Sequence, residues 1–171
     1  MQRTLLLLRH AKSDWSSSAT DDFSRPLSRR GKHDSPRMGQ WLQSHGLLPD
    51  YVVSSPAKRA HQTIKRVARE LGIDSADINW DERLYLASLS DLLAVIADCP
   101  LSTRSILLVG HNPGLESLLR HLAAASVSEP ADGKLMPTAA LAVLETRADW
   151  QHLQRGSAQL RELVRPRHLS L

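Results

Sequence analysis

Two histidines follow apolar runs of the kind that form buried strands. Leu5 to Leu8 is an unbroken leucine run that ends at Arg9-His10, and a second run, Ile106 to Val109, ends at Gly110-His111. Runs this short cannot cross a bilayer, but they fit strands that are covered on both faces, as in the centre of an α/β sheet. Open α/β sheets bind ligands beyond the carboxyl ends of their strands, where these arginine and histidine side chains would lie.

A third strand end carries a further cation. The apolar segment 51–53 leads to a helix start, because Ser55 is suited to the N-cap and Pro56 to the first helical position, with Arg59 in the first turn. Parallel strands end at one edge of a sheet, so we expect four side chains to converge there: Arg9, His10, Arg59 and His111. This set suits a tetrahedral oxyanion, since arginine donates as a bidentate fork, a protonated histidine adds charge and helix N–H groups complete the cradle.

The sequence predicts chemistry without a metal or cofactor. It contains neither a Walker glycine loop nor an acidic cluster with metal-ligand spacing, which argues against a nucleotide-dependent or magnesium-dependent reaction. We therefore expect any activity to survive EDTA, and a requirement for added Mg²⁺ would contradict that expectation.

The elements that must position these residues alternate between strands and helices. This order predicts a three-layer α/β/α fold with a mainly parallel sheet, and we find neither an internal repeat nor a domain boundary in residues 1–171. Ser28 is suited to cap a helix that ends at Gly46, with a kink or restart at Pro36. The last strands are expected at 138–146 and 150–153, joined as a hairpin.

Composition limits the partners and the compartment. The 171 residues include 22 Lys and Arg against 18 Asp and Glu, which gives a net charge of +4 and a sequence pI near 9.6. This charge can steer an anionic substrate but is too modest and dispersed to indicate nucleic acid, and aromatic residues make up only 4%. The single cysteine, Cys99, excludes an internal disulfide, and with no signal segment or long apolar run we expect a cytoplasmic protein without a membrane span.

Four stretches of the sequence resemble those of a known family. The stretches that carry the resemblance are Arg9-His10-Ala11-Lys12-Ser13, Arg25-Pro26-Leu27-Ser28, Ser54-Ser55-Pro56 with Arg59 and Gln62-Thr63, and Gly110-His111-Asn112-Pro113-Gly114. They are similar to the histidine phosphatase superfamily, with its phosphoglycerate-mutase-like fold and its Arg-His-Gly near the N-terminus. Ala11 replaces that glycine, a change found in one branch. Within the superfamily the chain most resembles the short SixA type, the phosphohistidine phosphatases, as a single domain.

The resemblance implies roles for the converging side chains. His10 would attack phosphorus and form a covalent phosphohistidine that water hydrolyses. Arg9, Arg59 and His111 would bind the non-bridging oxygens and stabilise the transition state. Because His10 must be neutral to attack while His111 is more useful protonated, we expect neighbouring charges to push their pKa values apart.

Four further residues have two interpretations each. Glu82 is the candidate acid for the leaving group, or else an exposed carboxylate paired with Arg83 or Lys58. Lys12 and Ser13 follow the nucleophile and either touch substrate or, as we expect, face solvent. Arg25 either guards the mouth of the site or pairs with Asp21 or Asp22. The C-terminal segment 165–167 is expected to be a solvated end.

The sequence therefore predicts a metal-independent phosphatase acting on protein phosphohistidine. A chain of this length lacks the long helical insert with which larger relatives enclose small substrates, so an open pocket would admit a side chain on a protein surface. The alternative is a phosphatase of a small phosphoester or nucleotide metabolite, which a positioned Glu82 would favour. A phospho-ligand binding module without turnover is the non-enzymatic alternative.

Overall fold

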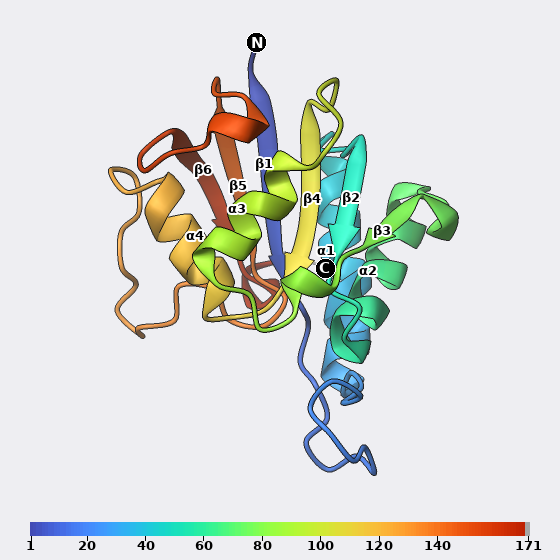
Figure 1. Ribbon diagram of the computed structural model, residues 1–171. Coiled ribbons are helices and arrows are strands. Elements are labelled where there is room, and N and C mark those ends of the chain that lie inside the picture. Colours follow the sequence, from blue (N-terminus) through green and yellow to red (C-terminus); the bar gives the residue numbers. More distant parts are fainter. Residues whose placement is uncertain (170–171) are drawn as a thin grey trace.

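A six-stranded sheet forms the centre of the computed structural model, which describes residues 1–169 (Figure 1). Its strands are β1 Arg3–Arg9, β2 Tyr51–Ser54, β3 Ile78–Trp80, β4 Ser105–Gly110, β5 Leu141–Thr146 and β6 Ala158–Val164. Their order is β3-β2-β4-β1-β5-β6. The strands β3, β2, β4 and β1 pair in parallel, whereas β5 pairs antiparallel with both β1 and β6. The mainly parallel α/β architecture expected from the sequence is confirmed.

Helices cover both faces of this sheet (Figure 1). One face carries α1 Arg29–Ser44 and α2 Lys58–Leu71, and the other carries α3 Leu89–Ala97 and α4 Gly114–Leu122. Successive side chains of a strand point to opposite faces. Leu5 and Leu7 accordingly pack with the α3 and α4 side chains, while Leu6 and Leu8 pack with those of α1 and α2. The unbroken leucine run exists because both faces of β1 are buried.

The first helix differs from its prediction in the middle. Ser28 caps it, since its hydroxyl accepts a hydrogen bond from the Gly31 N–H, and the chain turns at Gly46 with φ +66°. Pro36 neither ends nor restarts the helix, which runs unbroken from Arg29 to Ser44. Met38 and Leu42, beyond the proline, are fully buried. Burial of that face outweighs the one backbone hydrogen bond that proline removes.

The end of the chain also differs from its prediction. Residues 150–152 form a short 3₁₀ helix, η3 Trp150–His152, and the last strand is β6. The Trp150 indole is 2% exposed and donates to the Thr103 carbonyl, a tertiary contact that overrides strand propensity. Arg165 is buried rather than solvated, in an ion pair with Asp132.

Two expectations about the rest of the chain concern burial and membranes. Cys99 is 4% exposed, so its free thiol packs in the core like a small apolar side chain. Within residues 1–169, every helix is too short or too polar to span a bilayer.

Candidate active site

His10 follows β1 directly, and hydrogen bonds on both sides fix its backbone. Its N–H donates to the Gly110 carbonyl at 3.1 Å, and its own carbonyl accepts from the Ala139 N–H at 3.0 Å. The side chain is only 5% exposed, and its Nδ1 lies 2.8 Å from the Ala11 carbonyl oxygen. A carbonyl can only accept, so Nδ1 carries the proton and Nε2 keeps its lone pair.

The segment after His10 is held by α1 and α2. The Ala11 N–H donates to the Thr63 hydroxyl at 3.0 Å, and the Lys12 carbonyl accepts from the Ser28 N–H at 2.8 Å. A Cβ at Gly31 would lie 2.2 Å from the Lys12 carbonyl oxygen, so only glycine permits this approach. The contacts attach the nucleophile's segment to both helices on one face of the sheet.

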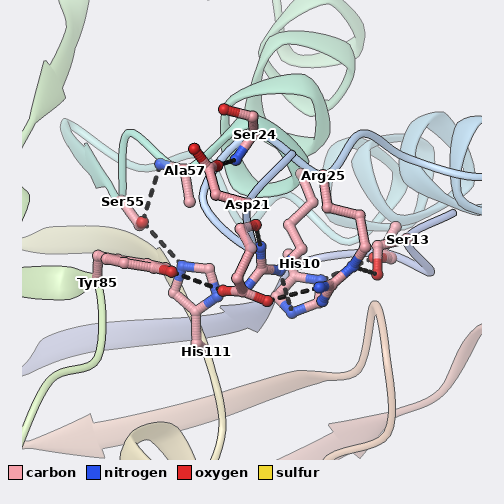
Figure 2. Close-up of polar contacts among 12 residues, drawn as sticks. His10, Ser13, Asp21, Ser24, Arg25, Ser55, Ala57, Tyr85 and His111 are labelled. Atoms are coloured by element: carbon pink, nitrogen blue, oxygen red, sulfur yellow. Dashed lines mark hydrogen bonds and ion pairs between the residues drawn. The ribbon is translucent and has the colours of Figure 1, made fainter. Parts of the chain in front are cut away.

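Arg59 projects from the first turn of α2 toward His10. Its guanidinium is buried, and Nε donates to His10 Nε2 at 3.4 Å. The helix begins two residues later than predicted, with Ala57 rather than Ser55 at the N-cap. The Ser55 hydroxyl still accepts from the Ala57 N–H, and it also contacts His111 Nε2 at 2.8 Å (Figure 2).

His111 follows β4 and faces His10, with ring centroids 5.0 Å apart. The Ser55 hydroxyl can donate its proton to His111 Nε2 while its oxygen accepts from the Ala57 N–H. The neutral His111 ring then carries its proton on Nδ1. That atom is buried and has no hydrogen-bond partner among the described residues. His111 can therefore donate to an anion without being protonated.

Arg9 lies beside the histidines, braced from behind by α4. Its Nη1 donates to the Met136 carbonyl at 3.1 Å, while its buried Nε lacks a partner within residues 1–169. Glu116 accepts from the Met136 N–H at 2.8 Å and from the Asn112 amide at 3.2 Å. Burial lowers the pKa of Arg9, and the Glu116 carboxylate opposes that shift. Sequence reasoning missed Glu116.

Both histidines are held neutral at physiological pH. Burial, reinforced by the neighbouring cations, lowers the pKa of His10 to about 3 and that of His111 to about 4. The expectation that their pKa values would be pushed apart is wrong, because the same burial and the same arginines act on both rings. A bound dianion would oppose the effect of these cations on both.

A carboxylate that sequence reasoning did not place in the site lies among these donors. Asp22, in the loop between β1 and α1, accepts from Arg59 Nη2 at 3.0 Å and from the Tyr85 hydroxyl at 2.6 Å. It also pairs with Arg25, whose Nε donates to the Ser13 hydroxyl at 2.8 Å. Of the two alternatives for Arg25, the ion pair with Asp22 is therefore present. Ser13 is 5% exposed, so the expectation that it faces solvent is wrong.

Tyr85 completes this side of the pocket. Its ring lies against His111 (Figure 2) in an edge-on arrangement with centroids 5.5 Å apart. Its hydroxyl donates to Asp22. Tyr85 follows the 3₁₀ turn η2 Glu82–Leu84. Glu82 itself is exposed, and its carboxylate makes no hydrogen bond or ion pair within residues 1–169. The expected pairing with Arg83 is absent there, because Arg83 binds Asp81 and Asp98 instead.

Together these residues form a cluster of hydrogen-bond donors with the geometry that an anion site needs. Arg9, His10, Arg59 and His111 converge as the sequence predicts, and two buried nitrogens, Arg9 Nε and His111 Nδ1, are unpaired within residues 1–169. Buried donors normally have hydrogen-bond partners, so an oxyanion bound between these two nitrogens would supply the acceptors that they lack. Across the described range, no three His, Cys, Asp or Glu side chains gather as metal ligands would.

Comparisons with known proteins agree with this geometry. Residues 5–85 match the model of the histidine phosphatase superfamily, branch 1. An uncharacterised protein of Mycobacterium tuberculosis is 32% identical over 157 residues, which cover 90% of this chain and 96% of that protein. An uncharacterised chloroplastic protein of Arabidopsis thaliana is 31% identical over 137 residues, 74% of this chain, and these span 62% of the Arabidopsis protein.

A solved structure is similar over nearly its whole length. It is that of a protein from Nakamurella multipartitia assigned as the phosphohistidine phosphatase SixA, with 30% identity and a TM-score of 0.83. The likeness covers 97% of each chain.

Proposed function

The chain belongs to the histidine phosphatase superfamily, branch 1, and from that premise we propose that it is a metal-independent phosphatase with His10 as its nucleophile. The observation that carries the proposal is the pair of contacts at His10. Its Nδ1 lies 2.8 Å from the Ala11 carbonyl, which fixes the proton there, and its Nε2 lies 3.4 Å from Arg59 Nε. The lone pair on Nε2 is therefore aimed at the guanidinium that would bind a phosphoryl group.

The reaction has two steps. His10 Nε2 forms a bond to phosphorus while the bond to the leaving group breaks, and water then hydrolyses the phosphohistidine. Arg59 and the unpaired Arg9 Nε and His111 Nδ1 donate to the three non-bridging oxygens. Donors fixed in a buried site stabilise the developing charge strongly, because little reorganisation is needed.

The protonation states fit both steps. A pKa of about 3 keeps His10 neutral and nucleophilic at physiological pH. Once phosphorylated on Nε2, the ring retains its proton on Nδ1 through the Ala11 carbonyl. It can then leave as neutral imidazole when water attacks, so the second step requires no separate acid for the leaving group.

We propose protein phosphohistidine as the substrate class. The similarity to a protein assigned as SixA supports it. The exposure of Glu82 supports it too, because a phosphoramidate leaving group needs less help from an acid than an alkoxide does. Farther along α2 from Arg59, the exposed face of the helix carries Lys65 and Arg69, which suit an acidic protein surface. For a small phosphoester, the alternative substrate, Glu82 remains the candidate acid.

The test compares hydrolysis of a phosphohistidine-bearing protein with that of p-nitrophenyl phosphate and common sugar phosphates, for wild type and Glu82→Ala. We expect a strong preference for phosphohistidine that Glu82→Ala leaves unchanged. A preference for phosphoesters that is lost in Glu82→Ala would assign the protein to the small-metabolite phosphatases. Binding of phosphate without turnover of any of these substrates would leave only the phospho-ligand binding module.

A further inference from the structure

The Asp22 carboxylate is the feature that the proposed reaction does not use. An anion site is built to attract negative charge, yet Asp22 places a fixed negative charge against its donors. The carboxylate accepts from Arg59 and Tyr85 and pairs with Arg25, while the Asp22 backbone carbonyl accepts from Arg59 Nη1 at 2.7 Å. The side chain is therefore bound from three directions.

The Asp22 carboxylate lies at the mouth of the site. The Arg59 side chain is 6% exposed, whereas that of Asp22 is 45% exposed. Arg59 turns its Nη1 and Nη2 atoms to Asp22 and its Nε to His10. In phosphoryl transfer the leaving group departs opposite the nucleophile. With His10 at the buried end, the leaving group must lie toward the mouth, on the side of Asp22.

The titratable groups nearest the reacting atoms are poor proton donors for that leaving group. The hydrogen bond from Tyr85, with those from Arg59 and Arg25, holds the pKa of Asp22 well below its usual range. The same bond raises the pKa of Tyr85, and both histidines are neutral. The charged or titratable groups facing Asp22 are Arg25 of its own loop, Arg59 of α2, Tyr85 after η2 and His111 after β4.

We propose that Asp22 determines specificity by selecting leaving groups that carry a positive charge, above all the protonated imidazole ring of a phosphohistidine. This inference rests on the proposed function. In such a substrate one ring nitrogen is bonded to phosphorus and the other carries a proton. His10 Nε2 bonds to phosphorus as the substrate P–N bond breaks, and the electron pair of that bond stays on the departing ring. The ring thereby becomes neutral imidazole and takes no proton from the enzyme.

The carboxylate favours the cationic form of the bound substrate. An opposite charge a few ångströms away raises the pKa of an imidazole by about one unit or more. For a phosphoester such as p-nitrophenyl phosphate, the Asp22 carboxylate slows the reaction instead. The leaving group gains negative charge as its bond to phosphorus breaks, and the carboxylate repels that charge. Asp22 therefore assists one class of substrate and opposes the other.

The experiment compares Asp22→Asn with wild type on phosphoimidazole and p-nitrophenyl phosphate across pH. Asparagine keeps the backbone carbonyl and an acceptor oxygen for Arg59 and Tyr85 but removes the charge. For phosphoimidazole we expect the alkaline limb of kcat to move about one unit lower, which is about a tenfold loss at alkaline pH. For p-nitrophenyl phosphate we expect kcat/KM to rise about threefold, since repulsion of the leaving group is relieved.

The matched control is Asp21→Asn, because that neighbouring carboxylate accepts from the Ser24 N–H at 2.8 Å instead. It should leave both profiles unchanged. Inhibition by inorganic phosphate checks Arg59 separately: it should be as strong or stronger in Asp22→Asn, whereas weaker inhibition would mean that Asp22 serves only to position the guanidinium.

Two results would overturn the role of Asp22 alone. One is an equal loss on both substrates at every pH, and the other is no change on either. A wild-type enzyme that hydrolyses p-nitrophenyl phosphate but not phosphoimidazole would overturn the proposed substrate class along with it.

Discussion

The two sides of the pocket are built by different means. The inner wall, Arg9, His10, Arg59 and His111, stands on strand ends and a helix start, and its backbone is tied to the sheet and its helices. The outer loop, residues 14–25, lies between β1 and α1 and holds its shape through polar contacts such as Arg25 to Ser13. His10 is 5% exposed in the inner wall, whereas Trp15 is 74% exposed in the outer loop.

The difference between the two sides suits them to different tasks: the inner wall to the reaction and the outer loop to substrate recognition. Nucleophilic attack needs atoms placed to within a fraction of an ångström, which the buried sheet edge provides. Recognition of varied phosphorylated surfaces needs groups that face solvent, which a loop provides. We therefore expect substitutions in the inner wall to reduce every activity, and those in the outer loop to change mainly which substrate is preferred.

The largest effect is expected from His10→Ala. Removal of the nucleophile should lower hydrolysis of every substrate by about a thousandfold or more and abolish the phosphoenzyme. The measurement is steady-state hydrolysis together with acid-quench trapping of phosphorylated protein. His152→Ala is the control, because that side chain is exposed and pairs with Asp149 at the surface. Substantial activity in His10→Ala would rule out His10 as the nucleophile. The inner wall would then not carry the chemistry, as we propose that it does.

Arg59→Lys should have the next largest effect. Lysine keeps the charge but loses the planar fork that reaches His10 and Asp22 together, so we expect kcat to fall about a hundredfold. The matched control is Arg69→Lys, an exposed arginine on the same helix, which should change kcat for p-nitrophenyl phosphate by less than about twofold. A kcat in Arg59→Lys close to that of wild type would mean that charge alone, and not the geometry of the inner wall, supports the reaction.

The inner wall could be predicted from the sequence because its position follows from hydrophobic pattern. The runs ending at His10 and His111 are buried on both faces, and two adjacent parallel strands bring their ends together. Arg59 was placed correctly although its helix begins at a different cap. The contact of the Ser55 hydroxyl with His111 was not predicted, because it joins residues 56 positions apart in the chain and no local pattern reveals it.

The outer loop could not be predicted, because its contacts follow no period. Asp22 reaches Arg59 across 37 positions and Tyr85 across 63, and nothing near Asp22 in sequence distinguishes it from Asp21. The Trp150 turn was missed for a similar reason, since its indole bonds to a carbonyl 47 positions away. Apolar periodicity reports burial, whereas polar contacts between distant loops depend on the assembled fold.

The smallest effect is expected from Trp15→Ala in the outer loop. The Arg25 guanidinium lies 3.7 Å from the centre of the Trp15 ring, and such a contact at an exposed site contributes about 0.5–1 kcal/mol. Arg25 keeps its ion pair with Asp22 and its bond to Ser13, so p-nitrophenyl phosphate hydrolysis should fall by less than about threefold. Steady-state kinetics on that substrate and on a phosphohistidine-bearing protein measure the change, with the larger loss expected on the protein. A loss on both as large as that of Arg59→Lys would show that the outer loop carries the chemistry as well, and the division between the two walls would fail.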